Sequence, residues 1–195
     1  MHPVTWNCIV IWGGAGLLVG QLTAWTVHRI TSWRPVGLPL VSAGLWAAAA
    51  GFGGGAPALL LTWWCACLMC TDIASRRLPN QLTAAGAVGV SAYAIAVGDF
   101  EAVLVGGGVL FGCYLAVHLL MPRAFGAGDV KLAFALGGLA GLFGTHAWVC
   151  AALLAPLFTG VVGLAYRALR RAESSVPHGP SMCLATLLAL TAAGT

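Results

Sequence analysis

The sequence predicts an all-α membrane protein, a polytopic bundle of about eight transmembrane helices, and three observations carry this prediction. Apolar residues make up 60% of the chain and charged residues only 7%, whereas soluble domains are usually about 25% charged. The apolar residues form long runs joined by connections too short for a separate soluble domain. The basic residues recur at every second connection. A bilayer is therefore the expected solvent for a single integral-membrane domain over residues 1–195.

Eight apolar segments are candidates for spanning helices, because a span needs about 20 mostly apolar residues. Their expected ranges are 8–27, 37–53, 56–72, 82–98, 101–120, 130–144, 147–167 and 180–195. The first segment is interpreted as a permanent span, since no basic region precedes it and His28 and Arg29 follow it. The sixth is short and meets the seventh near Gly144, and a partly re-entrant segment is the alternative there.

The connection after the third segment ends one helix and begins the next. Arg76 and Arg77 are expected to anchor the third helix at the lipid headgroups, and Pro79 prevents that helix from continuing. Asn80 then begins the turn into the fourth segment. Helical geometry would place Asp72 one turn from Arg76, so an interfacial ion pair is one interpretation of this aspartate.

The connection before the sixth segment carries Gly126 and Gly128 on either side of an alanine. Because glycine allows positive φ and close backbone contact, we expect a tight irregular turn there. Asp129 follows at the expected N-cap position of the sixth helix, and capping alone would account for it. Lys131 falls on a different helix face and is interpreted as a snorkelling anchor.

Small residues mark the remaining packing surfaces and the start of the last segment. The runs GGAGLLVG, GGGVLFG and ALGGLAG predict helix faces that approach one another closely. Pro177, Gly179 and Pro180 supply the start of the eighth helix, and His178 between them is expected to be a solvated loop histidine. All cysteines except Cys8 lie inside apolar segments, where they are interpreted as packing residues, so no metal site is expected.

The nine basic residues predict the topology. They occupy alternate connections: Arg29 and Arg34, Arg76 and Arg77, Arg123 and Lys131, and Arg167, Arg170 and Arg171. Lys and Arg mark the cytoplasmic side of short loops. The chain is therefore expected to begin outside, cross eight times and end outside. No connection holds a dense basic run, so a nucleic-acid partner is not expected.

Two of the five acidic residues stand out by position. Asp99 and Glu101 lie in an outer connection, and Glu173 lies beside arginines. Asp72 and Asp129 instead lie at the cytoplasmic ends of apolar segments, where ionisable groups are costly and usually functional. Two carboxylates in contact cannot both ionise easily, so one keeps a proton and the pair titrates as a unit. The charged carboxylate can take a proton from water while its neighbour donates one to a carbonyl oxygen, the division of labour of aspartic proteases.

Three segments, in this order, resemble the type IV prepilin leader peptidases, which belong to the GxGD aspartyl membrane proteases. DIASRRLPNQLT at 72–83 is similar to the first catalytic stretch of that family, GAGDVKL at 126–132 to its GxGD stretch, and VPHGPSMCLAT at 176–186 to its Pro-x-Gly-Pro turn. The resemblance implies that Asp72 and Asp129 are the catalytic pair. It implies supporting or substrate-binding roles for Pro79, Asn80, Gly126, Gly128, Lys131, Pro177, Gly179 and Pro180.

The implied activity is hydrolysis of leaders from pilin-like membrane precursors of type IV pili and protein secretion, at the cytoplasmic face of the cell membrane. Such precursors have a short basic leader that ends in glycine and precedes an apolar helix, and the reaction needs no metal or cofactor. The chain departs from the family pattern at Gln21–Ala24, where Ser-Phe-x-Asn is usual, and at His178, where an aromatic residue is usual. Only TSWRPVG stands where bifunctional members carry a cysteine-rich insert, so N-methyltransferase activity is not expected.

Two other functions are alternatives to this one. Another GxGD protease, cutting inside the bilayer as presenilin-like proteins do, would carry a Tyr-Asp motif and a Pro-Ala-Leu turn near the C-terminus. Here Thr71 precedes Asp72, and no such turn stands near the C-terminus. A transporter should show charged groups at mid-depth, and the polar residues there are only Gln21, Thr23, Tyr93, Tyr114, His118 and a few hydroxyls. A membrane scaffold would tolerate the loss of either aspartate.

Overall fold

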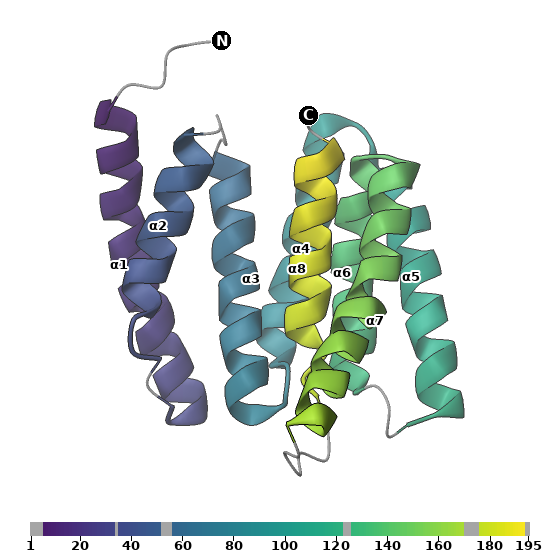
Figure 1. Ribbon diagram of the computed structural model, residues 1–195. Coiled ribbons are helices and arrows are strands. Elements are labelled where there is room, and N and C mark those ends of the chain that lie inside the picture. The colour runs from purple at the N-terminus through teal and green to yellow at the C-terminus, as the bar shows by residue number, and fades with distance from the viewer. Residues whose placement is uncertain (1–5, 34, 52–55, 123–125, 170–175, 194–195) are drawn as a thin grey trace. The chain divides into compact units, whose positions relative to one another are not determined.

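The computed structural model describes residues 6–33, 35–51, 56–122, 126–169 and 176–193. These residues form helices and no strand, which confirms the all-α prediction. The helices are α1 (Trp6–Thr31), α2 (Leu38–Gly51), α3 (Ala56–Ser75), α4 (Asn80–Val97), α5 (Phe100–Leu120), α6 (Ala127–Leu142), α7 (Thr145–Ala168) and α8 (Gly179–Ala193) (Figure 1). Several residues used in the topology and charge arguments lie outside the described residues: Arg34, Arg123, Arg170, Arg171 and Glu173.

The helix ends follow local turn chemistry. The expected boundary between the sixth and seventh segments is confirmed at Gly144, whose φ of 96° separates α6 from α7 in a conformation that favours glycine. Gly98, at φ 80°, ends α4 in the same way. α6 begins at Ala127, three residues earlier than expected, because the helix already includes most of the glycine-rich segment.

Four helices in the described part of the chain are long and apolar enough to cross a membrane. They are the segments Val10–Thr31, Pro57–Ser75, Phe100–Leu120 and Thr145–Ala168. α6 has 16 residues and is therefore about 24 Å long, shorter than a hydrocarbon core of about 30 Å. Eight crossings and two outer termini stay predictions.

The chain divides into an N-terminal unit, Met1–Ser75, and a C-terminal unit, Arg76–Thr195. The single domain expected from the sequence stays a prediction. In the N-terminal unit α1 packs against α2 and α3. A Cβ atom added at Gly16 would lie 2.7 Å from the Ser42 carbonyl oxygen, and one at Gly20 would lie 2.5 Å from Pro39 Cα. The predicted small-residue surface is confirmed here, because only glycine lets α1 approach α2 this closely.

A buried polar contact joins α1 to α3. The Trp63 indole Nε1–H donates to Thr23 Oγ1 at 2.7 Å, and the Thr23 hydroxyl donates in turn to the Val19 carbonyl oxygen at 2.8 Å. Cys67 Sγ lies 3.7 Å from the same hydroxyl oxygen. Thr23 is buried, so this hydroxyl satisfies an indole donor that would otherwise lie in apolar surroundings.

Thr23→Val is expected to lower the free energy of unfolding by about 1–3 kcal/mol, because it leaves the Trp63 N–H without its acceptor. Thr26→Val is the matched control, since Thr26 also donates to the carbonyl four residues earlier but receives no bond from another helix. We expect that variant to change stability by less than about 0.5 kcal/mol. Thermal unfolding in detergent measures both, and equal losses would contradict the role given to the indole contact.

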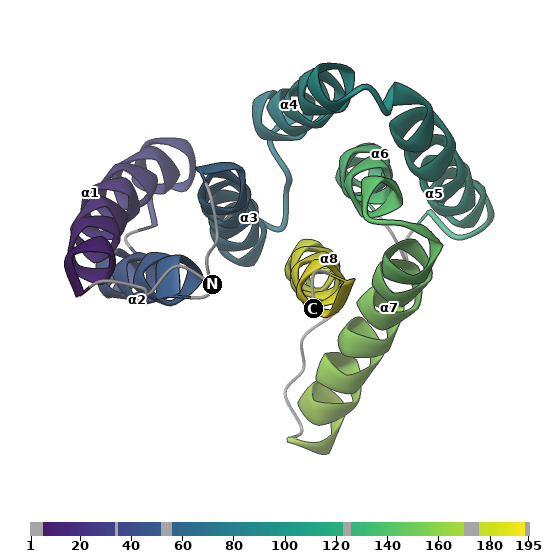
Figure 2. The same cartoon turned by 90° about the horizontal axis from the view of Figure 1, so that it is seen from above.

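In the C-terminal unit α6 is the helix in contact with all the others: α4, α5, α7 and α8 (Figure 2). Most of its residues are buried, including Leu132, Ala133 and Leu136. A Cβ atom at Gly106 would lie 2.7 Å from the Gly137 carbonyl oxygen, so α5 and α6 meet through glycine. This close contact makes α6 the buried centre of the unit and fixes where its first turn lies.

Candidate active site

Asp72 lies in the last turn of α3, with 5% of its surface exposed. The preceding residue, Thr71, is also buried, and its single hydroxyl proton is shared between the carbonyl oxygens of Cys67 and Leu68, at 2.9 and 3.0 Å. The Ser75 hydroxyl donates to the Thr71 carbonyl oxygen at 2.8 Å. These side chains satisfy backbone acceptors at the end of the helix and hold the turn that carries the aspartate.

The ion pair expected between Asp72 and Arg76 stays a prediction. α3 ends at Ser75, and Arg76 has a φ of 52°, in the left-handed region. A residue in this conformation commonly ends a helix. The chain therefore turns away from the axis of α3 directly after the turn that carries Asp72.

Asp129 lies in the first turn of α6 and is buried, with 9% of its surface exposed. Its carboxylate Oδ2 accepts a hydrogen bond from the Gly126 backbone N–H at 2.9 Å. The predicted N-cap position is wrong, because Gly126 is the N-cap and Asp129 is the third helical residue, whose side chain reaches back to the cap. The expected tight irregular turn is also wrong, because Gly126 has a φ of −74° and the chain is helical from Ala127 onward.

The second part of the first motif segment and the whole second motif segment lie together in the C-terminal unit. A Cβ atom at Gly128 would lie 3.0 Å from Leu78 Cβ, so glycine lets the start of α6 pack against the segment ahead of α4. Lys131 Nζ donates to Asn80 Oδ1 at 2.9 Å on an exposed surface. Lys131 is therefore not only a possible headgroup anchor. Its hydrogen bond joins the start of α6 to Asn80, the first residue of α4. Pro79 is the N-cap of α4, as its ring geometry allows.

The segment before α8 contains a functional candidate that the sequence analysis missed. His178 is 4% exposed, so the expected solvated histidine is wrong. Its Nε2 lies 2.9 Å from the Tyr114 hydroxyl, and its Nδ1 lies 2.6 Å from Thr159 Oγ1. Gly179 begins α8 directly afterwards and is buried. The sequence did contain a signal for a buried partner, because each of two apolar segments carries a polar residue inside it. These residues are Tyr114 on α5 and Thr159 on α7.

Burial lowers the pKa of His178 to about 4, below its ordinary value of 6.5. A histidine with a lowered folded-state pKa contributes stability that is present above pH 6.5 and is lost as the pH falls towards 4, because the unfolded chain takes up the proton first. We expect the melting temperature in detergent to fall through this window, with a contribution from His178 of at most about 3 kcal/mol.

His178→Phe is expected to flatten this part of the stability profile relative to the wild type. His146→Phe, which changes an exposed histidine at the start of α7, should keep the wild-type slope. Melting temperatures recorded between pH 7 and pH 4 make the comparison. Parallel curves for all three proteins would contradict the burial argument.

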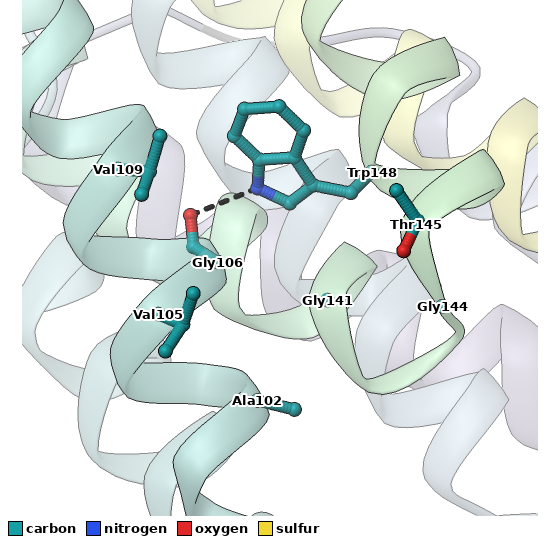
Figure 3. A pocket seen from close by; sticks show the side chains of 8 residues that line it. All are labelled: Ala102, Val105, Gly106, Val109, Gly141, Gly144, Thr145 and Trp148. Carbon is teal, nitrogen blue, oxygen red and sulfur yellow. Dashed lines mark hydrogen bonds between the residues drawn. The ribbon is translucent and has the colours of Figure 1, made fainter.

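A cavity of about 280 Å³ lies at the other end of α6 (Figure 3). Val105, Val109 and Trp148 line it, and the Trp148 indole donates to the Gly106 carbonyl oxygen at 2.8 Å across its wall. Gly141, also on its wall, is separated from Asp129 by about 18 Å along the helix. The cavity is therefore separate from the aspartate.

Asp72 and Asp129 belong to different units, and their meeting stays a prediction. Each is a buried carboxyl group at the end of a helix, an arrangement suited to proton transfer. A scan against protein families matches residues 59–165, more than half of the chain and both aspartates, to the type IV leader peptidase family. The chain belongs to the type IV leader peptidase family. Comparisons with curated proteins and with solved structures gave no significant match.

Membership of the leader peptidase family confirms the resemblance drawn from the sequence motifs. The protein is therefore a protease of the leader peptidase kind, and its four long apolar helices and its family together indicate a membrane protein. The matched range runs from α3 through most of α7 and does not include His178.

Proposed function

We propose that the protein is an aspartic endopeptidase that removes the short leader from type IV pilin-like precursors at the cytoplasmic face of the membrane. The observation that carries this proposal is the burial of two carboxyl groups, Asp72 and Asp129, at the ends of α3 and α6. In a chain that is only 7% charged, an aspartate is costly at such a place unless it is used.

In the proposed reaction a water molecule lies between the two carboxyl groups, one ionised and one protonated. The carboxylate takes a proton from the water as its oxygen attacks the scissile carbonyl carbon, and the protonated carboxyl donates to the carbonyl oxygen. The resulting gem-diol collapses when one of its hydroxyl groups gives a proton to the carboxyl group that is now ionised, and the peptide nitrogen accepts the proton held by the other, neutral carboxyl group. The carbon–nitrogen bond then breaks, and the dyad ends with one proton, as it began.

The placement of one aspartate in each unit makes both units necessary for this chemistry. We therefore propose that residues 1–195 act as one multi-pass membrane peptidase domain. Within the C-terminal unit the Lys131–Asn80 hydrogen bond and the Gly128–Leu78 contact join two of the three motif segments. This joined surface beside Asp129 is the proposed site for the unwound cleavage segment. Pro177, Gly179 and Pro180 support it by placing the start of α8.

The test is co-expression with a precursor that carries a short basic leader ending in glycine, followed by an apolar helix. We expect a shorter product on a gel, and mass spectrometry should place its new N-terminus directly after the glycine. A precursor with valine in place of this glycine is the matched control and should remain uncut. Cleavage inside the apolar helix would favour the intramembrane protease, and no cleavage of either precursor would contradict the proposal.

A further inference from the structure

The direction of the hydrogen bonds around His178 depends on the tautomer of its ring, and we assign the tautomer from the bond that the Thr159 hydroxyl makes on its own helix. The Thr159 hydroxyl donates its one proton to the Ala155 carbonyl oxygen at 3.1 Å. Towards His178 it therefore acts as an acceptor, so the imidazole proton lies on Nδ1. A neutral imidazole with this proton accepts at Nε2, and the Tyr114 hydroxyl is then the donor across 2.9 Å. Burial keeps the ring neutral, since it lowers the pKa of His178 to about 4.

The packing of α5 on α6 places Tyr114 opposite Asp129. Added Cβ atoms show that Gly141 faces Ala102 and that Gly137 faces Gly106, at 2.7 and 2.8 Å from their carbonyl oxygens. Each step of four residues forward on α5 thus matches four residues back on α6, as expected for two antiparallel helices whose facing rows recur every turn. Two such steps from the Gly106–Gly137 pair reach Tyr114 on α5 and Asp129 on α6.

Two further observations agree with this register. Tyr114 is buried although its helix is largely exposed, so it points into the unit rather than away from it. It also lies within electrostatic range of the Asp129 carboxyl group. The chain of hydrogen bonds therefore runs from Thr159 on α7, through His178 before α8, to Tyr114 on α5, and in the α5–α6 register Tyr114 faces the first turn of α6.

We propose that Tyr114 and His178 are positioning residues that keep the proton of the catalytic pair on Asp129. Because His178 holds the Tyr114 hydroxyl proton, the phenol oxygen presents only lone pairs to Asp129, which favours the protonated carboxyl over the carboxylate. This inference rests on the proposed function. It assigns Asp129 as the group that donates to the scissile carbonyl oxygen, and it leaves Asp72 as the base that takes the proton from water.

Other groups act on the same carboxyl group. The Gly126 N–H at the start of α6 favours the carboxylate, so the tyrosine opposes the helix terminus. The elements packed against α6 carry other titratable and charged groups: Arg76 and Arg77 ahead of α4 and Tyr93 on it, Asp99 at the N-cap of α5 with Glu101, Cys113, Tyr114 and His118 on that helix, His146, Cys150, Tyr166 and Arg167 on α7, and His178 and Cys183 around the start of α8. Lys131 lies on α6 itself. Among the residues that the structure describes on α5, the tyrosine is the titratable one that is both buried and in line with Asp129 in the α5–α6 register.

The deciding variant is Thr159→Val, which keeps side-chain shape and removes the acceptor that holds the imidazole proton on Nδ1. The ring is then free to carry its proton on Nε2 and donate to the tyrosine oxygen, and the phenol proton turns to Asp129. A hydrogen bond to the carboxylate lets Asp129 lose its proton more easily. We expect the alkaline limb of the cleavage pH profile to move about one pH unit lower.

His178→Asn is a second variant, because its amide can still donate to Thr159 while no longer reaching Tyr114. It should shift the alkaline limb in the same direction. Adding Thr159→Val to Tyr114→Phe should give no shift beyond that of Tyr114→Phe alone, since no phenol proton remains to redirect. Thr191→Val, which removes an exposed hydroxyl bonded only within its own helix, and Tyr93→Phe, at an exposed tyrosine, should keep the wild-type profile.

The test of this inference is the cleavage rate of the purified, folded protein in detergent, recorded from pH 5 to pH 10. An unchanged alkaline limb in both Thr159→Val and His178→Asn would overturn the inference. So would a uniform loss of rate at every pH, which indicates a structural role. If Asp72→Asn and Asp129→Asn abolish cleavage while the limb stays in place, only this inference fails. If those aspartate variants still cleave, the proposed function itself fails.

Discussion

Replacing either Asp72 or Asp129 by asparagine is expected to lower leader cleavage by about 100- to 10,000-fold, the range that general acid–base groups contribute. Asparagine keeps the size and polarity of the side chain but cannot take up or release the proton. In Asp129→Asn the amide oxygen can still accept from the Gly126 N–H, so the start of α6 should be preserved. Asp129→Asn therefore tests the proton transfer while it leaves the start of α6 intact.

The measurement is the ratio of precursor to product for a co-expressed precursor, with membrane levels of each variant recorded in parallel. Asp99→Asn is the matched control. Asp99 is an exposed N-cap that accepts from the Ala102 N–H at 3.4 Å, and asparagine can accept the same bond, so cleavage should be unchanged. Full cleavage by either the Asp72 or the Asp129 variant would mean that the aspartate is structural, and the scaffold alternative would replace the peptidase.

Gly107→Ala is expected to lower the free energy of unfolding by about 1–3 kcal/mol, the typical penalty for overfilling a packed contact. Its new methyl group would lie 2.6 Å from the Phe134 carbonyl oxygen, and a backbone atom cannot move aside as a flexible side chain does. α5 and α6 would have to separate, which also displaces the first turn of α6 and Asp129. Cleavage should therefore fall together with stability.

Gly108→Ala, one residue further along the same helix, is the matched control. No atom lies within 4 Å of a Cβ added there, so no neighbouring atom has to move to make room for the methyl group. Because alanine favours the helix over glycine, this variant should gain up to about 1 kcal/mol. Unfolding in detergent by heat or by denaturant measures both variants. Equal stability of the two would show that α5 does not need glycine to pack on α6.

The helical architecture was predictable because it depends on local properties of the chain. The lengths of the apolar runs and the glycines near 98 and 144 are sufficient to place the helices to within a few residues. The start of α6 was misplaced for a local reason as well, since Asp129 can serve a helix start either as the cap or from the third position. The sequence pattern does not distinguish the two.

The contacts of the candidate site were less predictable because they join residues that are far apart in the chain. Lys131 and Asn80 are separated by 51 positions, and Tyr114 and His178 by 64. An apolar helix has no polar face to indicate which side meets its neighbour, so hydropathy could not say that His178 is buried. The motif around His178 indicated only that a helix begins there.

By itself the sequence determined that this protein is helical, that its helices meet through small residues, and that it belongs with the type IV leader peptidases. Composition and short motifs are enough for these conclusions, because each depends on neighbouring residues or on apolar run length. Only the tertiary structure decided that Asp129 is a buried third helical residue, that Gly128 packs on Leu78, and that His178 joins Tyr114 to Thr159. Such contacts depend on which helix faces come together, and packing rather than local propensity selects them.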